Sequence, residues 1–295
     1  MFEGLTVALV TPFRNGAIDG EAVDRLVEHC VEGGADGLVP SGSTGESPVL
    51  TAEERRELFR RVKRASRGRA FLLAGTGTNS TASTVAQTRV AAEEGADGAL
   101  VVTPYYNKPT PAGLIGHYRQ VADEGGLPVC LYNVPGRTGI NLLPSTVAEL
   151  SGHERITAIK EASGSLDQVT EICAQSRLTV LSGDDSLTLP ILAVGGAGVI
   201  SVLGNLVPGP MKRLLAAFGA GDLAGAIEIH HRLYPLARAM FIESNPGPIK
   251  YALARVGLIA HELRPPLAPV TAGSAARIDA ALAALPDGWL ARRPS

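Results

Sequence analysis

Polar residues follow directly after a series of short apolar runs in this chain, and one such place holds a lysine. In ITAIKEASGS, residues 156–160 have the character of a buried β-strand that ends at Lys160 and is followed by a turn. The chain has only five lysines, so a lysine at this point is not a default choice. Burial penalises the charged ammonium, so we expect Lys160 to act as an amine nucleophile that forms a Schiff base with a ketone or 2-oxo acid. The alternative is a lysine that reaches solvent at the rim and pairs with Glu161.

A second cluster, GSTGE, has the groups that bind a carboxylate. Ser43 and Thr44 supply hydroxyls, and Gly42 and Gly45 leave backbone amides open. The alternative is a plain turn between a strand and a helix, capped by its own hydroxyls. No lysine follows at the position found in a phosphate-binding loop, which argues against a nucleotide phosphate.

Two further residues can act beside Lys160. Tyr132 ends the apolar run 129–132, where its phenol can pass a proton to or from an imine. Arg137, in YNVPGRTG, can hold a second carboxylate through two parallel hydrogen bonds. The alternatives are a packing tyrosine with a satisfied hydroxyl and an exposed loop arginine.

The sequence predicts no metal site. Its six histidines are scattered, without the spacing of metal ligands. Asp184 and Asp185 in SGDD suggest Mg²⁺, but two acids followed by Ser186 more simply cap the next helix. We therefore assign no metal and no cofactor.

The apolar runs alternate with segments of helical periodicity. Helix starts are marked by the capping-box spacing of TAEE from Thr51 and by STAS from Ser80. The strand-like runs cover residues 6–10, 37–40, 71–74, 99–102, 129–132, 156–160, 179–181 and 198–202. This alternation predicts an α/β fold, a (β/α)8 TIM barrel over residues 1–222, with the polar clusters meeting at the carboxyl ends of the strands. Beyond residue 222 the alternation stops, and we predict a C-terminal helical region over 223–295, broken by NPGP and RPPLAP.

Composition narrows the class of protein. A hydrophobic content of 45% in 295 residues is enough for a large core, and the net charge of −2 gives no basic stripe for nucleic acid. The start, MFEGLTVALVTPF, lacks a basic region and is interpreted as a first strand, and no apolar run approaches the roughly 20 residues that span a membrane. Three cysteines far apart are typical of a reducing compartment, so we expect a cytoplasmic protein.

These clusters resemble one known family across nearly the whole chain. GSTGES, TPYYNKP, YNVPGRTG, IKEASG, SGDD, GGAGVISV and NPGPIK occur in the order and spacing of the dihydrodipicolinate synthase/N-acetylneuraminate lyase family. The resemblance implies a class I aldolase, a lyase on a (β/α)8 barrel with a C-terminal helical region. Within the family, YNVPGRTG is similar to members that condense pyruvate with L-aspartate-4-semialdehyde to 4-hydroxy-tetrahydrodipicolinate, in lysine and diaminopimelate biosynthesis.

The resemblance also implies a role for each matching residue. Lys160 would form the imine with pyruvate, and Tyr106 would cross a dimer interface into the neighbouring subunit's site. A homo-oligomer is thereby implied, either a dimer or a tetramer built from dimers. The implied catalytic residues are Lys160, Tyr132, Ser43 and Tyr106, and the implied substrate-binding residues are Thr44, Arg137, Gly183 and Ile200.

Some positions depart from the family pattern. Ser43 stands where threonine is usual, and Ala197 stands where histidine is frequent. The lysine-feedback pocket of some members is matched at Asn79 and Tyr105, but its usual polar ligands are missing at Pro48, Ala52, Arg55 and Ser83. We therefore do not expect inhibition by lysine.

Two other functions stay open beside this one. The first is a 2-oxo-acid aldolase or dehydratase of the same family that acts on a sugar acid or another aldehyde. Arg137 favours aspartate semialdehyde instead, because it suits a small aldehyde that bears a carboxylate. The second is a catalytically silent paralogue that binds 2-oxo acids, and the intact set of catalytic residues argues against it.

Overall fold

Eight parallel strands form a closed barrel. The computed structural model describes residues 2–290. Around the barrel the strands lie in the order β1-β10-β9-β8-β7-β6-β5-β4. The strands are β1 Gly4–Ala8, β4 Gly37–Val39, β5 Phe71–Gly75, β6 Gly98–Val102, β7 Val129–Asn133, β8 Ile156–Glu161, β9 Thr179–Ser182 and β10 Gly198–Ser201. The predicted TIM barrel is confirmed, and each of the eight expected strands overlaps one of these.

The strands are apolar because both of their faces are buried. On β7, Cys130 and Tyr132 belong to a small core inside the barrel, while Val129 and Leu131 belong to the larger core beneath the helices. Successive side chains of a strand point to opposite faces, and parallel strands covered on both sides are apolar throughout. Lys160, a buried residue on β8, is one of the few charged exceptions to this pattern.

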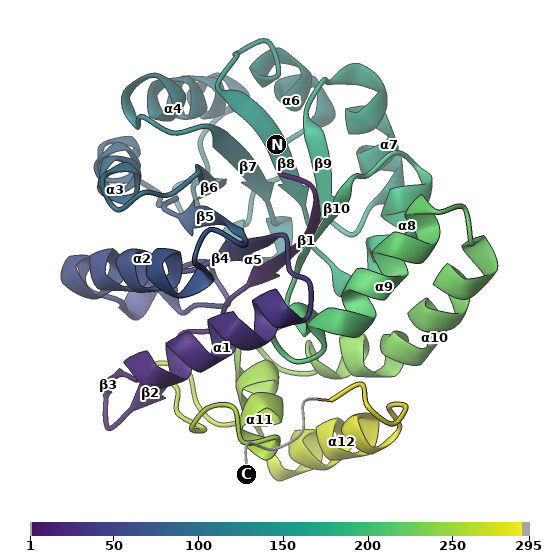
Figure 1. The fold of residues 1–295 in the computed structure, drawn as a ribbon. Helices are drawn as coiled ribbons and strands as arrows, with labels where there is room; N and C mark the ends of the chain where they lie inside the picture. The colour runs from purple at the N-terminus through teal and green to yellow at the C-terminus, as the bar shows by residue number, and fades with distance from the viewer. Residues whose placement is uncertain (1, 291–295) are drawn as a thin grey trace.

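Helices surround the barrel (Figure 1). They are α1 Gly20–Glu32, α2 Ala52–Ser66, α3 Thr81–Glu93, α4 Pro111–Glu124, α6 Pro144–Leu150, α7 Leu166–Gln175, α8 Thr188–Ala193 and α9 Pro208–Gly219. The two expected helix starts are confirmed: Thr51 and Glu54 form a capping box on α2, and the Ser80 side chain accepts a hydrogen bond from the Ser83 amide on α3. Four short helices occupy loops after strands: η1 Ser47–Val49, α5 Pro135–Thr138, η2 Asp185–Leu187 and η3 Leu203–Asn205.

Three further helices follow the barrel. Helix α10, Leu223–Ala239, packs along α9, and α12, Ala272–Ala283, packs against both α10 and α11, Gly247–Arg255 (Figure 1). The helical character expected after residue 222 is confirmed. The division into two units at that residue stays a prediction.

A two-stranded ribbon lies between β1 and α1 and was not expected. It pairs β2, Phe13–Arg14, with β3, Ala17–Ile18, around an Asn15–Gly16 turn. Asn-Gly is a strong hairpin signal, but strands of two residues are too short to show a periodic pattern.

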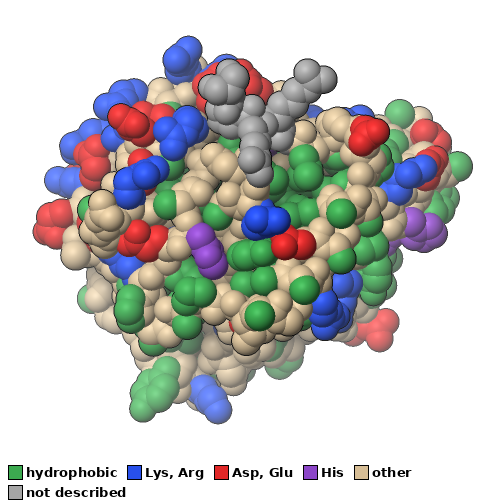
Figure 2. All heavy atoms as spheres, turned by 90° about the horizontal axis from the view of Figure 1, so that it is seen from below, with side chains coloured by type: hydrophobic (Ala, Val, Ile, Leu, Met, Phe, Trp, Pro, Cys, Tyr) green, Lys and Arg blue, Asp and Glu red, His purple; other side chains and the backbone are tan. Residues whose placement is uncertain are grey.

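The surface carries mixed charge. On the face seen in Figure 2, Lys and Arg side chains are interspersed with Asp and Glu side chains. Arg60 on α2 also pairs at 2.9 Å with Glu94, which follows α3. That face therefore lacks the basic stripe of a nucleic acid binding surface. No helix within residues 2–290 is long and apolar enough to cross a membrane.

Candidate active site

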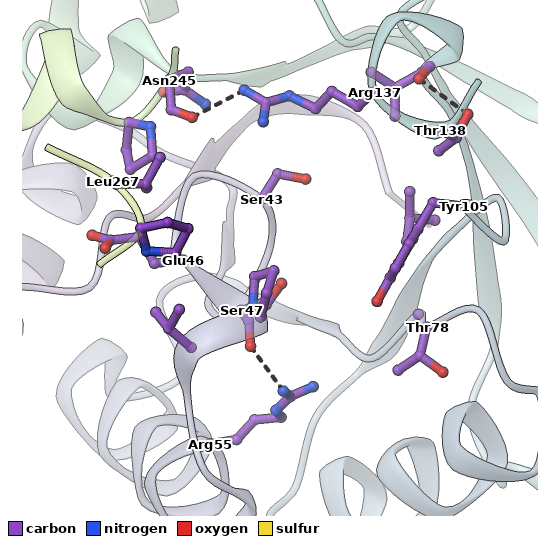
Figure 3. A pocket seen from close by; sticks show the side chains of 17 residues that line it. Ser43, Glu46, Ser47, Arg55, Thr78, Tyr105, Arg137, Thr138, Asn245 and Leu267 are labelled. Carbon is purple, nitrogen blue, oxygen red and sulfur yellow. Dashed lines mark hydrogen bonds between the residues drawn. The ribbon is translucent and has the colours of Figure 1, made fainter. Parts of the chain in front are cut away.

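A cavity of about 310 Å³ opens beside the carboxyl ends of β4 to β7. Figure 3 shows Ser43 directed into it, with Tyr105 and Thr78 on one side and Glu46 and Leu267 on the other. The barrel supplies Ser43, Glu46, Ser47, Pro48, Val49, Arg55, Gly77, Thr78, Val102, Tyr105, Val134, Arg137 and Thr138, and the C-terminal region supplies Asn245, Pro246, Pro266 and Leu267. The breaks at NPGP and RPPLAP thus form part of the cavity wall.

Lys160 lies inside the barrel next to this cavity. Its side chain is buried, and its Nζ is 4.3 Å from the centre of the Tyr132 ring. The two residues are paired across β7 and β8, and Tyr132 is paired in turn with Val102, which lines the cavity. The structure therefore brings together the expected amine and phenol, although neither side chain belongs to the cavity wall itself.

The alternative pairing of Lys160 with Glu161 is wrong. Consecutive strand residues face opposite sides, and Glu161 accepts hydrogen bonds from the Ser163 amide at 2.7 Å, from Asn133 Nδ2 at 3.0 Å and from Gln168 Nε2 at 3.1 Å. Burial raises the pKa of Glu161, and these three donors oppose that effect.

Cys130 and Asp184 are titratable neighbours of Lys160, which was not expected from the sequence. Burial raises the pKa of the Cys130 thiol to about 12, and the nearby charge of Lys160 only partly offsets this. A protonated thiol does not compete with the amine as a nucleophile. Burial also raises the pKa of Asp184, again opposed by Lys160. Cys130 was detectable, because it lies two residues before Tyr132 and so shares its face of the strand.

Asp184 occupies the N-cap position of the next helix, η2, but the prediction that the side chains of Asp184 and Asp185 cap that helix is wrong. No side-chain cap bond is present at the start of η2 or of α8. Asp185 instead accepts hydrogen bonds from the amides of Val202 at 3.0 Å and Leu203 at 2.9 Å, which follow β10. These amides need an acceptor because they lie at the start of the short helix η3, where no helical carbonyl is available to them. Their distance along the chain from Asp185 hides this contact from a local pattern.

The GSTGE loop is partly closed on itself. The amides of Gly45 and Ser47 both donate to the Gly42 carbonyl, and the Glu46 amide donates to the Ser43 carbonyl. The expectation that Gly45 leaves its amide open is therefore wrong. Glycine is needed here for space, since a Cβ at Gly45 would lie 3.0 Å from the Ser41 nitrogen.

The two hydroxyls of the loop take different positions. Ser43 lines the cavity, whereas Thr44 is buried and its Oγ1 accepts a hydrogen bond of 2.9 Å from Asn245 Nδ2. Because Thr44 Oγ1 accepts from Asn245, its own hydrogen is free to donate elsewhere.

Gly183 lies against Lys160, and Ile200 lies in the inner core of the barrel. A Cβ at Gly183 would lie 3.1 Å from Lys160 Cε and 2.6 Å from the Ala162 Cβ, so only glycine fits without displacing them. Ile200 is fully buried in the same inner core as Tyr132.

Arg137 lies at the cavity, whereas Tyr106 lies outside it. Arg137 lines the cavity, and its Nη2 donates a 3.0 Å hydrogen bond to the Asn245 carbonyl (Figure 3). Tyr106 is 88% exposed and stands outside the cavity, which Tyr105 lines instead. Within one subunit the structure thus leaves Tyr106 apart from the other expected residues.

Known proteins resemble this chain along almost its entire length. The model of the family described as "Dihydrodipicolinate synthetase family" matches residues 1–285. A 4-hydroxy-tetrahydrodipicolinate synthase from Geobacter sp. (strain M21) is 51% identical over 282 residues, which are 95% of this chain and 97% of the relative.

Solved structures give the same result. The 4-hydroxy-tetrahydrodipicolinate synthase of Methylacidiphilum fumariolicum is 43% identical over 96% of each chain, with a TM-score of 0.95. A dihydrodipicolinate synthase from Acinetobacter baumannii, solved in complex with pyruvate, is 37% identical over 96% of this chain and 99% of its own, with a TM-score of 0.94. With its barrel, its buried lysine and these relatives, the chain belongs to the dihydrodipicolinate synthetase family.

Proposed function

We propose that this chain is a 4-hydroxy-tetrahydrodipicolinate synthase, a lyase of lysine biosynthesis that condenses pyruvate with L-aspartate-4-semialdehyde. The assigned activity is supported by relatives of that name whose sequences are 51% identical over 95% of this chain. The observation that carries the chemistry is Lys160, buried at the end of a barrel strand against the ring of Tyr132.

The Lys160 amine attacks the carbonyl carbon of pyruvate, and loss of water leaves an imine. Tyr132, beside the amine, moves protons to and from this centre. The hydroxyls of Ser43 and Thr44 hold the pyruvate carboxylate. The protonated imine withdraws electrons, so the pyruvate methyl group loses a proton and its carbon attacks the aldehyde to form the new carbon–carbon bond.

The second substrate approaches from the cavity. Arg137 lines the cavity with its guanidinium and holds the carboxylate of the aldehyde substrate. One N–H group of Arg137 is fixed on the Asn245 carbonyl, which leaves four donors for a ligand. A sugar-derived aldehyde without a carboxylate in this place would leave Arg137 unpaired.

The working unit is a homo-oligomer in which each subunit supplies Tyr106 to its neighbour. The support is the 88% exposure of this tyrosine, far above that of an ordinary aromatic side chain. We place the enzyme in the cytoplasm, since its three cysteines are unpaired.

The proposal is tested by steady-state kinetics with pyruvate and a series of aldehydes. We expect kcat/KM for aspartate semialdehyde to exceed that for sugar-derived aldehydes by about 30-fold or more, because only the former pairs with Arg137. A preference for a sugar-derived aldehyde would assign the chain to the aldolases of the family. No turnover of any aldehyde, with pyruvate still bound, would indicate a silent paralogue.

A further inference from the structure

A buried ion pair lies at the wall of the cavity, where Glu46 is one of the lining residues, and neither member contacts substrate in the proposed reaction. Lys250, on α11, donates from Nζ to a carboxylate oxygen of Glu46, and both side chains are 0% exposed. The two residues are 204 positions apart in the chain. The pair thus joins the C-terminal region directly to the loop after β4.

Every charged group in this pair has further partners. Lys250 Nζ also donates to the Glu262 carbonyl at 2.8 Å and lies 4.3 Å from the centre of the Phe13 ring. The second oxygen of Glu46 accepts a 3.0 Å hydrogen bond from the Arg264 amide. Burial lowers the pKa of Lys250, and the charge of Glu46 opposes this effect. A buried pair with this many partners fixes the atoms around it, because moving either charge would leave the other unsatisfied.

The fixed atoms belong to the loop that carries Ser43 and Thr44. Glu46 follows Thr44 by two positions and has a φ of 56°, in the left-handed region that is costly for a residue other than glycine. The same loop has a second tie to the C-terminal region, the bond from Asn245 Nδ2 to Thr44 Oγ1. Two side chains from beyond the barrel therefore hold one short loop at the cavity.

We propose that Lys250 is a positioning residue for pyruvate binding: through Glu46 it holds the loop of residues 42–47 so that Ser43 and Thr44 meet the pyruvate carboxylate. Lys250 contacts no substrate in this scheme. The inference rests on the proposed function, because it assumes that these hydroxyls bind pyruvate.

The test replaces the two charges separately and together. Lys250→Met keeps the length of the side chain and leaves Glu46 without its partner, whereas Lys250→Met combined with Glu46→Gln removes both charges and keeps an acceptor for the Arg264 amide. Lys212→Met is the matched control, since it breaks a 2.6 Å pair with Asp36 that is away from the residues of the site. Each protein is incubated with a range of pyruvate concentrations and borohydride, and the trapped adduct is measured by mass.

We expect Lys250→Met to raise the pyruvate concentration needed for half-maximal trapping about 10-fold or more, because displaced binding groups lose much of their effect. The double variant should recover most of this loss, and Lys212→Met should match the wild type. If Lys250→Met does not fold, Glu46→Gln alone is measured, and its trapping should shift in the same direction.

Two results would overturn the inference. One is a Lys250→Met protein that melts at a lower temperature but still traps pyruvate at the concentration that the wild type needs. Where Lys250→Met does not fold, the same result in Glu46→Gln counts. The ion pair would then contribute to stability alone. The other is a double variant that is as impaired in pyruvate binding as Lys250→Met. A wild-type protein that traps no pyruvate would instead contradict the proposed function, so the two failures are distinguishable.

Discussion

Arg137 offers the most specific prediction about substrate choice. Its side chain lines the cavity, and its Nη2 is fixed on the Asn245 carbonyl (Figure 3). Replacing it with alanine removes two charge-assisted hydrogen bonds to the carboxylate of the aldehyde. Each such bond contributes about 1.5–3 kcal/mol when it is buried. Arg137 is exposed, so we take about 1 kcal/mol for each and about 2 kcal/mol in total.

A loss of about 2 kcal/mol corresponds to roughly a 30-fold fall in kcat/KM for aspartate semialdehyde. The pyruvate adduct with Lys160 should form as in the wild type, because Arg137 acts on the other substrate. Arg137→Lys is the matched control: it keeps the charge but loses the two parallel bonds, so its kcat/KM should fall between those of the wild type and the alanine variant.

The assay follows product formation with aspartate semialdehyde varied at saturating pyruvate, together with borohydride trapping of pyruvate alone. An unchanged kcat/KM in Arg137→Ala would refute the role in aldehyde binding. Equal losses in aldehyde kinetics and in pyruvate trapping would show that the substitution disturbs the whole site rather than one substrate.

Tyr106 and His117 give two further predictions. Tyr106→Phe should lower turnover roughly 10²-fold, which is the scale of a lost proton-transfer group. Mixing this variant with inactive Lys160→Ala under conditions of subunit exchange should restore part of the activity. Mixed oligomers that show no recovery would place Tyr106 outside the neighbour's site. Burial lowers the pKa of His117 from 6.5 to about 4, so the unfolded chain takes up a proton that the folded protein does not between those pH values. The free energy of unfolding should therefore fall as the pH is lowered through this window, by about 2 kcal/mol at pH 5. Urea unfolding at pH 7 and pH 5 checks this, because the free energy of unfolding of His117→Asn should fall less between the two pH values than that of the wild type.

Much of the barrel was predictable because each strand is a short apolar run next to a glycine or a polar turn. The run that ends at Lys160, for instance, became β8, Ile156–Glu161, with one further residue at its end. The ribbon around Asn15 and Gly16 was missed because strands of two residues carry no periodicity. A local sequence pattern therefore predicts only the elements that are long enough to show periodicity.

The candidate site was predictable in its residue types but not in its long-range contacts. The lysine and tyrosine were expected together because each ends a strand, and strand ends meet at one face of a barrel. The tie between Lys250 and Glu46 joins residues 204 positions apart, so no local spacing indicates it. The hydrogen bonds of Asp185 were missed for the same reason, because their donors are backbone amides that follow β10, far along the chain.

The central claim is that Lys160 forms the Schiff base. The most direct measurement is treatment of the wild-type protein with pyruvate and borohydride, followed by peptide mapping in a mass spectrometer. We expect one reduced pyruvate adduct per chain, on the peptide that contains Lys160. Lys250, a second buried lysine engaged by Glu46, is an internal control that should stay unmodified. An adduct on any other lysine, or none at all, would contradict the covalent mechanism.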